Sequence, residues 1–216
     1  GYISGSGPSV PAGGYVGTRE RKYGFTHEAD VIFPNYESES DPIVRNYLTS
    51  SLFGMYTVNT ASAAAPNWEA FLDFDPSNLQ VRAIRPKAGS KDVYFQLDSA
   101  NSPWPLKTIS AETKLLTSSV FYDVYDNERW NFSVRIKPTK DFAAIVTGAL
   151  SPSSYGYDVI FRGINTFLGE VKNSFELTGE ISFQSGSDLL QNSKRVYCGA
   201  ERTNYTGTLL HKSDVQ

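Results

Sequence analysis

The fold of this chain is decided by residues 118–137, SSVFYDVYDNERWNFSVRIK. Aromatic and β-branched residues recur at a two-residue spacing on both sides of a polar turn, Asp126–Arg129. This is the period of a strand that buries one face, and polar residues at the centre mark a chain reversal. The stretch therefore predicts a β-hairpin with strands at Ser118–Tyr125 and Trp130–Lys137.

Outward from this stretch, similar short runs predict further strands. They lie at Ala29–Phe33, Leu52–Val58, Leu79–Arg85, Asp92–Leu97, Tyr157–Gly163, Asn173–Ser182, Arg195–Ala200 and Gly207–Leu210; Asn67–Phe74 suits a strand or one helical turn. Thirteen Tyr and thirteen Phe suit pleated strands, while seventeen Gly and eleven Pro supply turns. No long helical period competes with these runs. The sequence predicts an all-β fold, a two-sheet antiparallel β-sandwich of the jelly-roll kind.

The length of 216 residues suits one large sandwich. Residues 1–17 are rich in Gly, Pro and Ser, which predicts a flexible arm or linker ahead of a domain at 18–216. The chain starts at Gly1 without Met and stops where a closing strand would begin. We therefore expect a piece of a longer protein, truncated before its closing strand.

Composition argues against two classes of partner. The formal charge is −3 and no dense basic stripe occurs, which disfavours nucleic acid. No apolar run approaches the roughly 20 residues that span a bilayer, so membrane insertion is not expected.

Cys198 stands alone, which excludes an intrachain disulfide and predicts a buried thiol in a strand. A solitary Cys suits assembly in a reducing host cytoplasm.

The second half of the chain, about residues 117–216, resembles the laminin-G/concanavalin A-like lectin superfamily. The resemblance is carried by a turn and Trp at Asp126–Trp130, a strand at Tyr157–Gly163, and Val196–Ala200 followed by a polar loop and Gly207. It implies a jelly-roll sandwich with Trp130 in the core. Since the superfamily includes lectins, adhesins, hydrolases and structural modules, it implies no single function.

The tail is similar to versions of this fold in phage and large-virus structural proteins, on Arg202–Gly207 and Ser213–Val215. This resemblance implies a non-catalytic structural or adhesion domain in a capsid decoration, tail or fibre protein. The expected partners are other virion subunits, including copies of the chain itself, and host glycans. The alternatives are a carbohydrate-binding module of a secreted or cell-surface protein, and a glycoside hydrolase or lyase on the same fold.

Sugars require aromatic rings for their C–H faces and polar groups for their hydroxyls. Trp104 lies between Pro103 and Pro105 in a loop, which predicts a stiff exposed platform, although a loop Trp can equally pack beneath a sheet. The loop Glu201–Thr206 adds a polar and aromatic tip. The predicted carbohydrate-binding residues are Trp104, Arg202, Asn204 and Tyr205.

Laminin-G domains often carry calcium at the sandwich rim, so the resemblance also allows a calcium ion held by Asp123, Asp126 and Asn127. Glu128, Asp73 and Asp75 offer further oxygens. A polar turn without a metal explains Asp123, Asp126 and Asn127 equally well. No other cofactor is expected. For catalysis, Glu69, Asp73 and Asp75 are the nearest approach to a carboxylate pair, but they lack the hydrolase pattern. With only two His and no catalytic motif, the sequence predicts that the chain is not an enzyme.

Overall fold

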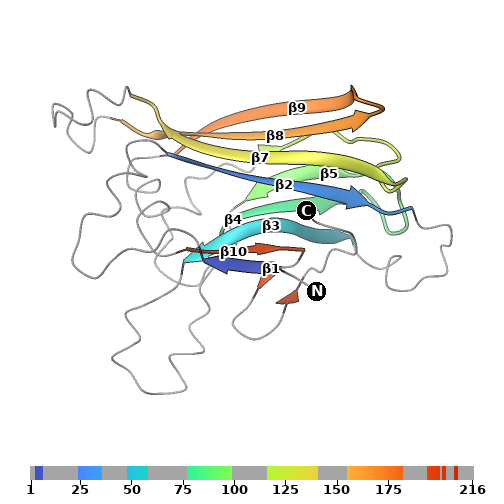
Figure 1. The fold of residues 1–216 in the computed structure, drawn as a ribbon, viewed down its shortest axis with the longest axis horizontal. Helices are drawn as coiled ribbons and strands as arrows, with labels where there is room; N and C mark the ends of the chain where they lie inside the picture. Colours follow the sequence, from blue (N-terminus) through green and yellow to red (C-terminus); the bar gives the residue numbers. More distant parts are fainter. Residues whose placement is uncertain are drawn as a thin grey trace, which may run out of the picture.

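The computed structural model shows two antiparallel β-sheets packed face to face (Figure 1). The structure describes residues 3–6, 24–35, 48–57, 77–98, 116–140, 155–181, 194–199, 201–202 and 207–208. Within these ranges no helix has the length and hydropathy needed to cross a bilayer. The predicted all-β, two-sheet sandwich is confirmed.

The four-stranded sheet forms one layer of the sandwich. Its spatial order is β2 (Phe25–Phe33), β7 (Glu128–Pro138), β8 (Tyr157–Phe167) and β9 (Glu170–Ile181). On β7 the even-numbered residues from Glu128 to Ile136 are buried, and the odd-numbered ones lie on the outer face. This alternation is what a strand with one face against a core requires. A two-residue turn joins β8 directly to β9.

The six-stranded sheet forms the second layer. Its spatial order is β1 (Ile3–Ser6), β10 (Lys194–Cys198), β3 (Thr49–Thr57), β4 (Ser77–Ile84), β5 (Tyr94–Asp98) and β6 (Leu116–Thr117). A small separate ladder joins β11 (Glu201–Arg202) to β12 (Gly207–Thr208). In the six-stranded sheet β10 lies between β1 and β3, and in the four-stranded sheet β2 lies beside β7, so these neighbouring strands come from distant parts of the sequence.

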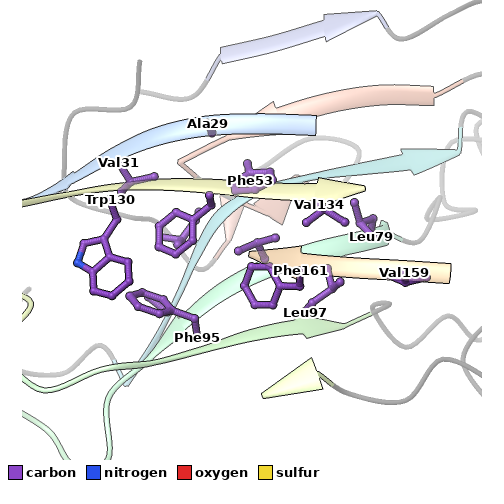
Figure 2. Packing of buried hydrophobic residues seen from close by; sticks show 14 of the residues in the cluster. Ala29, Val31, Phe53, Leu79, Phe95, Leu97, Trp130, Val134, Val159 and Phe161 are labelled. Atoms are coloured by element: carbon purple, nitrogen blue, oxygen red, sulfur yellow. The ribbon is translucent and has the colours of Figure 1, made fainter. Parts of the chain in front are cut away.

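The core lies between the two layers and is rich in aromatic rings. Figure 2 shows Trp130 and Val134 of β7 and Phe161 of β8 facing Phe95 and Leu97 of the other sheet. The largest fully buried side chains are Trp130, Tyr157, Phe33, Phe53, Phe95, Phe132, Phe161, Leu52, Leu97 and Ile136. Because each fully buried apolar side chain contributes about 1.5–3 kcal/mol, this cluster supplies much of the driving force for folding. The predicted core position of Trp130 is confirmed.

The predicted hairpin of Ser118–Tyr125 with Trp130–Lys137 is wrong. Phe121 forms an isolated bridge to Val93 at the edge of the six-stranded sheet, while β7 belongs to the four-stranded sheet, between β2 and β8. Positive φ angles at Asp123 (54°) and Asn127 (62°) interrupt any regular strand before Glu128. The alternation was real, but the two halves of the stretch pack in different layers.

The other predicted strands within the described residues are confirmed, with ends that move by a few residues, as β2, β3, β4, β5, β8, β9, β10 and β12. The segment Asn67–Phe74 lies outside the described residues. Residues 3–6, inside the segment expected to be an arm, form β1 against β10. Cys198 lies half-buried at the end of β10, and burial raises the pKa of its thiol.

Candidate recognition surface

Several loops meet at one end of the sandwich, on the right in Figure 1, where β2 and β8 end. They are residues 34–35, 85–92 and 118–127, together with the β8–β9 turn. We call this region the loop end. The pairing of Phe33 with Glu128 and the bridge from Val93 to Phe121 bring these segments together from distant parts of the sequence.

Hydrogen bonds join three of these loops. Lys91 Nζ donates to Asn35 Oδ1 at 2.9 Å. The backbone N–H of Asn35 donates to Asn127 Oδ1, also at 2.9 Å. The backbone N–H of Tyr125 donates to the carbonyl of Lys91 at 3.2 Å. The loop end is therefore a connected structure in which each loop restrains its neighbours.

The predicted calcium ligands belong to this network. Asn127 Oδ1 accepts from Asn35, and Asp126 lies 3.7 Å from the Lys91 ammonium. Asp123 is held through its backbone N–H, which donates to Asp92 Oδ1 at 3.2 Å. Calcium needs six to eight converging oxygens, and an ammonium group beside the site opposes a cation. Across the described ranges no group of three acidic, His or Cys side chains could hold a metal. In the structure these three residues tie neighbouring loops together, and calcium binding by them stays a prediction.

Glu128, also considered for calcium, links the core to the β8–β9 hairpin. Its Oε2 accepts from Trp130 Nε1 at 3.0 Å, and its Oε1 accepts from Lys172 Nζ. A register shift after Asn165 leaves Lys172 outside the regular β8–β9 pairing, as in a β-bulge. Glu128, hydrogen-bonded to the ammonium, raises the pKa of Lys172, with smaller contributions from Asp123 and Asp126. The hairpin is thus fastened to β7 across β8.

A cluster of aromatic rings supports the loop end from below. Phe121 lies 4.9 Å from Trp130 and 5.8 Å from Phe175 between ring centroids. Phe95 completes the cluster at 4.8 Å from Trp130, and it stacks on Phe175 at 5.8 Å. Gly163 leaves the space that the Phe175 ring fills, since an added Cβ would collide with it. The loop 118–127 therefore rests on a close-packed base.

Exposed apolar side chains gather at the same end. Leu168 is 88% exposed, Tyr122 74%, Phe167 66% and Val171 61%. Val120 and Leu48 are also exposed, the latter at the start of β3 where its carbonyl accepts from Arg85. These six are all the exposed large hydrophobic residues among those that the structure describes. Their concentration on neighbouring loops marks this end as a contact surface, since scattered single residues would carry no such meaning.

The outer face of the four-stranded sheet differs in character. Arg129 Nη2 lies 2.7 Å from Asp30 Oδ2, and this contact lowers the pKa of Asp30. Arg162 of β8 is paired in register with Glu176 of β9. Of the six exposed apolar residues, Val171 lies at the end of this face, where it is paired in register with Thr166. This face is a solvated surface with balanced charge, and its carboxylates lie beside cationic groups.

The structure tests little of the predicted carbohydrate site. Trp104, Asn204 and Tyr205 lie outside the described residues. Arg202 lies in β11, where its backbone pairs with Gly207. The carboxylates considered for catalysis, Glu69, Asp73 and Asp75, also lie outside these ranges. The structure therefore does not test whether the predicted carbohydrate-binding residues, or these three carboxylates, lie close together.

Sequence reasoning missed Tyr122 and Leu168. A signal for Leu168 was present, because Phe167-Leu168-Gly169 places an apolar residue before Gly between two alternating runs, where Asn or Asp is usual. Tyr122 carried no comparable signal. Its neighbours Phe121 and Val124 face the core, and only the fold shows that its own ring points outward.

Comparisons with known proteins add one structural likeness. No protein-family model matches the chain, and no curated protein matches it. Among solved structures it is similar to the CBM2 module of the evolved Dit of Lactobacillus casei BL23 phage J-1, with 8% sequence identity and a TM-score of 0.42. That alignment covers 99% of this chain and 64% of the other, so the chain spans less than two thirds of that protein. At this distance the likeness carries no argument, and the proposals below rest on the chain's own residues.

Proposed function

We propose that this chain is a non-catalytic structural or adhesion domain of a virion that recognises its target, including host glycans, through the loop end. The carrying observation is that the exposed apolar side chains of the described residues gather on adjoining loops above a rigid aromatic base. A binding protein requires such a surface, because apolar area left in water is stabilised only when a ligand or partner covers it.

Tyr122 is the best candidate to contact a sugar. The backbone of Phe121 forms two hydrogen bonds with Val93, at 2.9 and 2.8 Å, and Asp123 is held by Asp92. The ring between them projects from a backbone that is fixed on both sides. A rigid aromatic side chain contributes contact area at a low entropic cost, and the nearby carboxylates of Asp92 and Asp123 can accept hydrogen bonds from sugar hydroxyls.

The family part of the proposal rests on the resemblance of residues 117–216 to laminin-G/concanavalin A-like domains. Three features support it: the two-sheet sandwich, the start of β7 at the turn before Trp130, and the course of β8 through Tyr157–Gly163. The virion location rests on the similarity of the tail to viral structural proteins. A secreted carbohydrate-binding module would use the same surface.

The non-catalytic part is supported by the carboxylates of the four-stranded sheet. Asp30 is paired with Arg129 and Asp158 with Lys137, at 2.7 and 3.6 Å. A retaining hydrolase needs two carboxylates about 5–5.5 Å apart, one of them kept protonated as the acid. The hydrogen bond from Arg129 lowers the pKa of Asp30, which favours its charged form and makes it unsuited to the acid role.

Glycan-array binding of the purified chain tests the proposal, with Tyr122→Ala against Tyr122→Phe as the matched control. We expect binding to fall at least about tenfold in the Ala variant because truncation of a central aromatic contact costs more than about 1.4 kcal/mol. The Phe variant keeps the ring and most of the binding. Trp104→Ala is measured in parallel to locate the aromatic platform. If only this variant loses glycan binding, the site lies on the loop around Trp104 and not at Tyr122.

Two results overturn the proposal. One is the absence of binding to any glycan on the array together with absence of the chain from purified particles by mass spectrometry. The other is release of reducing sugar from a polysaccharide by the wild-type chain, which would make it a hydrolase. Detection of the chain in a secretome instead of in particles would favour the secreted module.

A further inference from the structure

The outer face of the six-stranded sheet, which is turned away from β7 and β8, carries a group of polar side chains (Figure 1). On β4 the residues that join the core are Leu79, Val81 and Ala83. Because side chains alternate along a strand, Gln80 and Arg82 lie on the outer face. An amide and a guanidinium group are thus neighbours on a strand with a partner on each side.

Strands β3 and β5 add polar side chains beside Arg82. In register Arg82 is paired with Ser51 of β3 and with Gln96 of β5, and Gln80 is paired with Asp98 of β5. The burial pattern of β5 alternates, and Gln96 and Asp98 are its half-buried members on this face. We call these five residues, from three strands, the Arg82 cluster.

A buried amide holds the guanidinium of Arg82 in place. Arg82 Nε donates to Gln80 Oε1 at 2.6 Å, and Gln80 Nε2 donates to Ser51 Oγ at 3.4 Å. Neither Gln80 nor Ser51 is exposed to solvent. A side chain that is fixed before binding loses little conformational entropy when a ligand arrives.

The other donors of this guanidinium are open. Arginine has five N–H groups, and Gln80 accepts from one of them. Asp98 Oδ2 lies 3.7 Å from Nη1, which is too far for a direct hydrogen bond. Arg82 makes no other hydrogen bond or ion pair with the residues that the structure describes. Its side chain is only 21% exposed, so donors that are largely withdrawn from water favour a ligand that supplies acceptors.

The charge of the cluster favours a neutral ligand. Along the described strands β3, β4, β5 and β6 the charged side chains are Arg82 and Asp98, and their charges cancel. An anion would have to compete with Asp98 for the guanidinium. The gap of 3.7 Å can instead be spanned by one hydroxyl oxygen, which accepts from Nη1 and donates to Oδ2. Neutral sugars present many such hydroxyl groups.

Gln96 and Tyr94 extend the cluster along β5. Gln96 Nε2 donates to Thr117 Oγ1 at 3.2 Å, and no described residue donates to its Oε1, which can accept from a second hydroxyl. Tyr94 is half-buried on the same face, two residues or about 7 Å along the strand from Gln96. Its ring can cover a C–H face of a sugar. The outer face therefore combines polar and aromatic groups that suit a sugar.

We propose that the Arg82 cluster is a second carbohydrate site, which binds a neutral sugar through its hydroxyl groups with Tyr94 beside it. The proposal does not rest on the loop end, because the two sites share no residue. Acidic sugars are the less suitable ligand because Asp98 repels them.

An NMR titration of the isotope-labelled chain tests the proposal, with cellohexaose, maltohexaose and galactohexaose as the neutral probes. We expect at least one of them to shift the Nε–Hε resonance of Arg82. Arg82→Lys keeps the charge but loses the planar set of donors, so we expect Kd to rise at least about tenfold. Arg162→Lys makes the same change at an exposed position on the outer face of the other sheet and should leave Kd unchanged.

Two further variants keep the test independent of the contact between Arg82 and Gln80. Gln96→Ala removes one acceptor, and we expect it to weaken binding of the neutral probe severalfold. Asp98→Asn removes the negative charge beside the guanidinium. We expect this variant to bind the neutral probe less tightly and to gain affinity for hexagalacturonate.

Three results overturn the proposal: no shift at Arg82 with any neutral probe, neutral-sugar binding that Arg82→Lys leaves unchanged, and binding of hexagalacturonate alone by the wild type. Tyr122→Ala separates this site from the loop end. If Tyr122→Ala abolishes glycan binding and Arg82→Lys does not, the outer-face site is wrong and the loop end stands. The opposite pattern supports the outer-face site and contradicts glycan binding at Tyr122.

Discussion

The two ends of the sandwich are packed with different side chains. Beneath the loop end lie rings: Phe95, Phe121, Trp130, Phe132 and Phe175, with centroids 4.7–6.4 Å apart where they touch. At the opposite end the packing is mixed: Met55, Leu79, Val134, Ile136, Val159 and Ile181 are buried there together with Tyr157 and Phe53. Large flat rings interlock through edge and stacked contacts and resist rearrangement more than aliphatic chains do.

This difference assigns different tasks to the two ends. The loop end must hold irregular backbone in place, because the loop 118–127 has two residues with positive φ and presents Tyr122 to solvent. A rigid aromatic base lowers the entropy lost when such a loop binds a target. At the opposite end the described irregular segments are short, and the backbone N–H of Thr139 donates to the carbonyl of Gly156 at 3.0 Å between two of them.

The largest effect is expected from Trp130→Ala. The change removes a fully buried ring and leaves a cavity in the aromatic end, so we expect the free energy of unfolding to fall by about 3–5 kcal/mol. Ile136→Val on the same strand, at the opposite end, should cost only about 0.5–1.5 kcal/mol. Urea unfolding of both variants measures the contrast. Equal losses would mean that the aromatic end has no special part in stability.

The sequence contained enough to predict the layers but not how the loop end is assembled. Alternation along Trp130–Lys137 and Tyr157–Gly163 predicts half-buried strands, since that pattern depends only on local geometry. Which strand pairs with which depends on long-range contacts, so Phe121 was assigned to the wrong partner. The candidate contact residues were harder still. Tyr122 and Phe121 are adjacent aromatic residues, and only the three-dimensional packing shows that Phe121 joins the buried ring cluster while Tyr122 is exposed.

A smaller effect is expected at the link between the aromatic end and the hairpin. The Glu128 side chain is 8% exposed and that of Lys172 is 53% exposed. Lys172→Met leaves a buried carboxylate with the Trp130 indole as its remaining partner and should cost about 2 kcal/mol. Glu128→Gln leaves an ammonium that water can solvate, keeps an acceptor for Trp130, and should cost about 1 kcal/mol. Denaturant unfolding of both variants checks this order. If Glu128→Gln cost more stability than Lys172→Met, the Lys172 ammonium, and not the Glu128 carboxylate, would be the group that needs its partner.

The smallest effect is expected from acid at the other end of the sheet, where His27 of β2 packs half-buried against Phe53, with ring centroids 4.7 Å apart. Burial lowers the pKa of His27 below its ordinary value of 6.5, so the unfolded chain binds the proton more readily than the folded one. Stability should therefore fall as pH drops below about 6.5, by at most about 1.4 kcal/mol per pH unit, until the folded group also titrates. His27→Leu keeps the apolar contact without the titrating group, and it should flatten unfolding free energies measured between about pH 7 and pH 5. His211 is common to both proteins, so an undiminished slope in the variant would assign the proton uptake to groups other than His27.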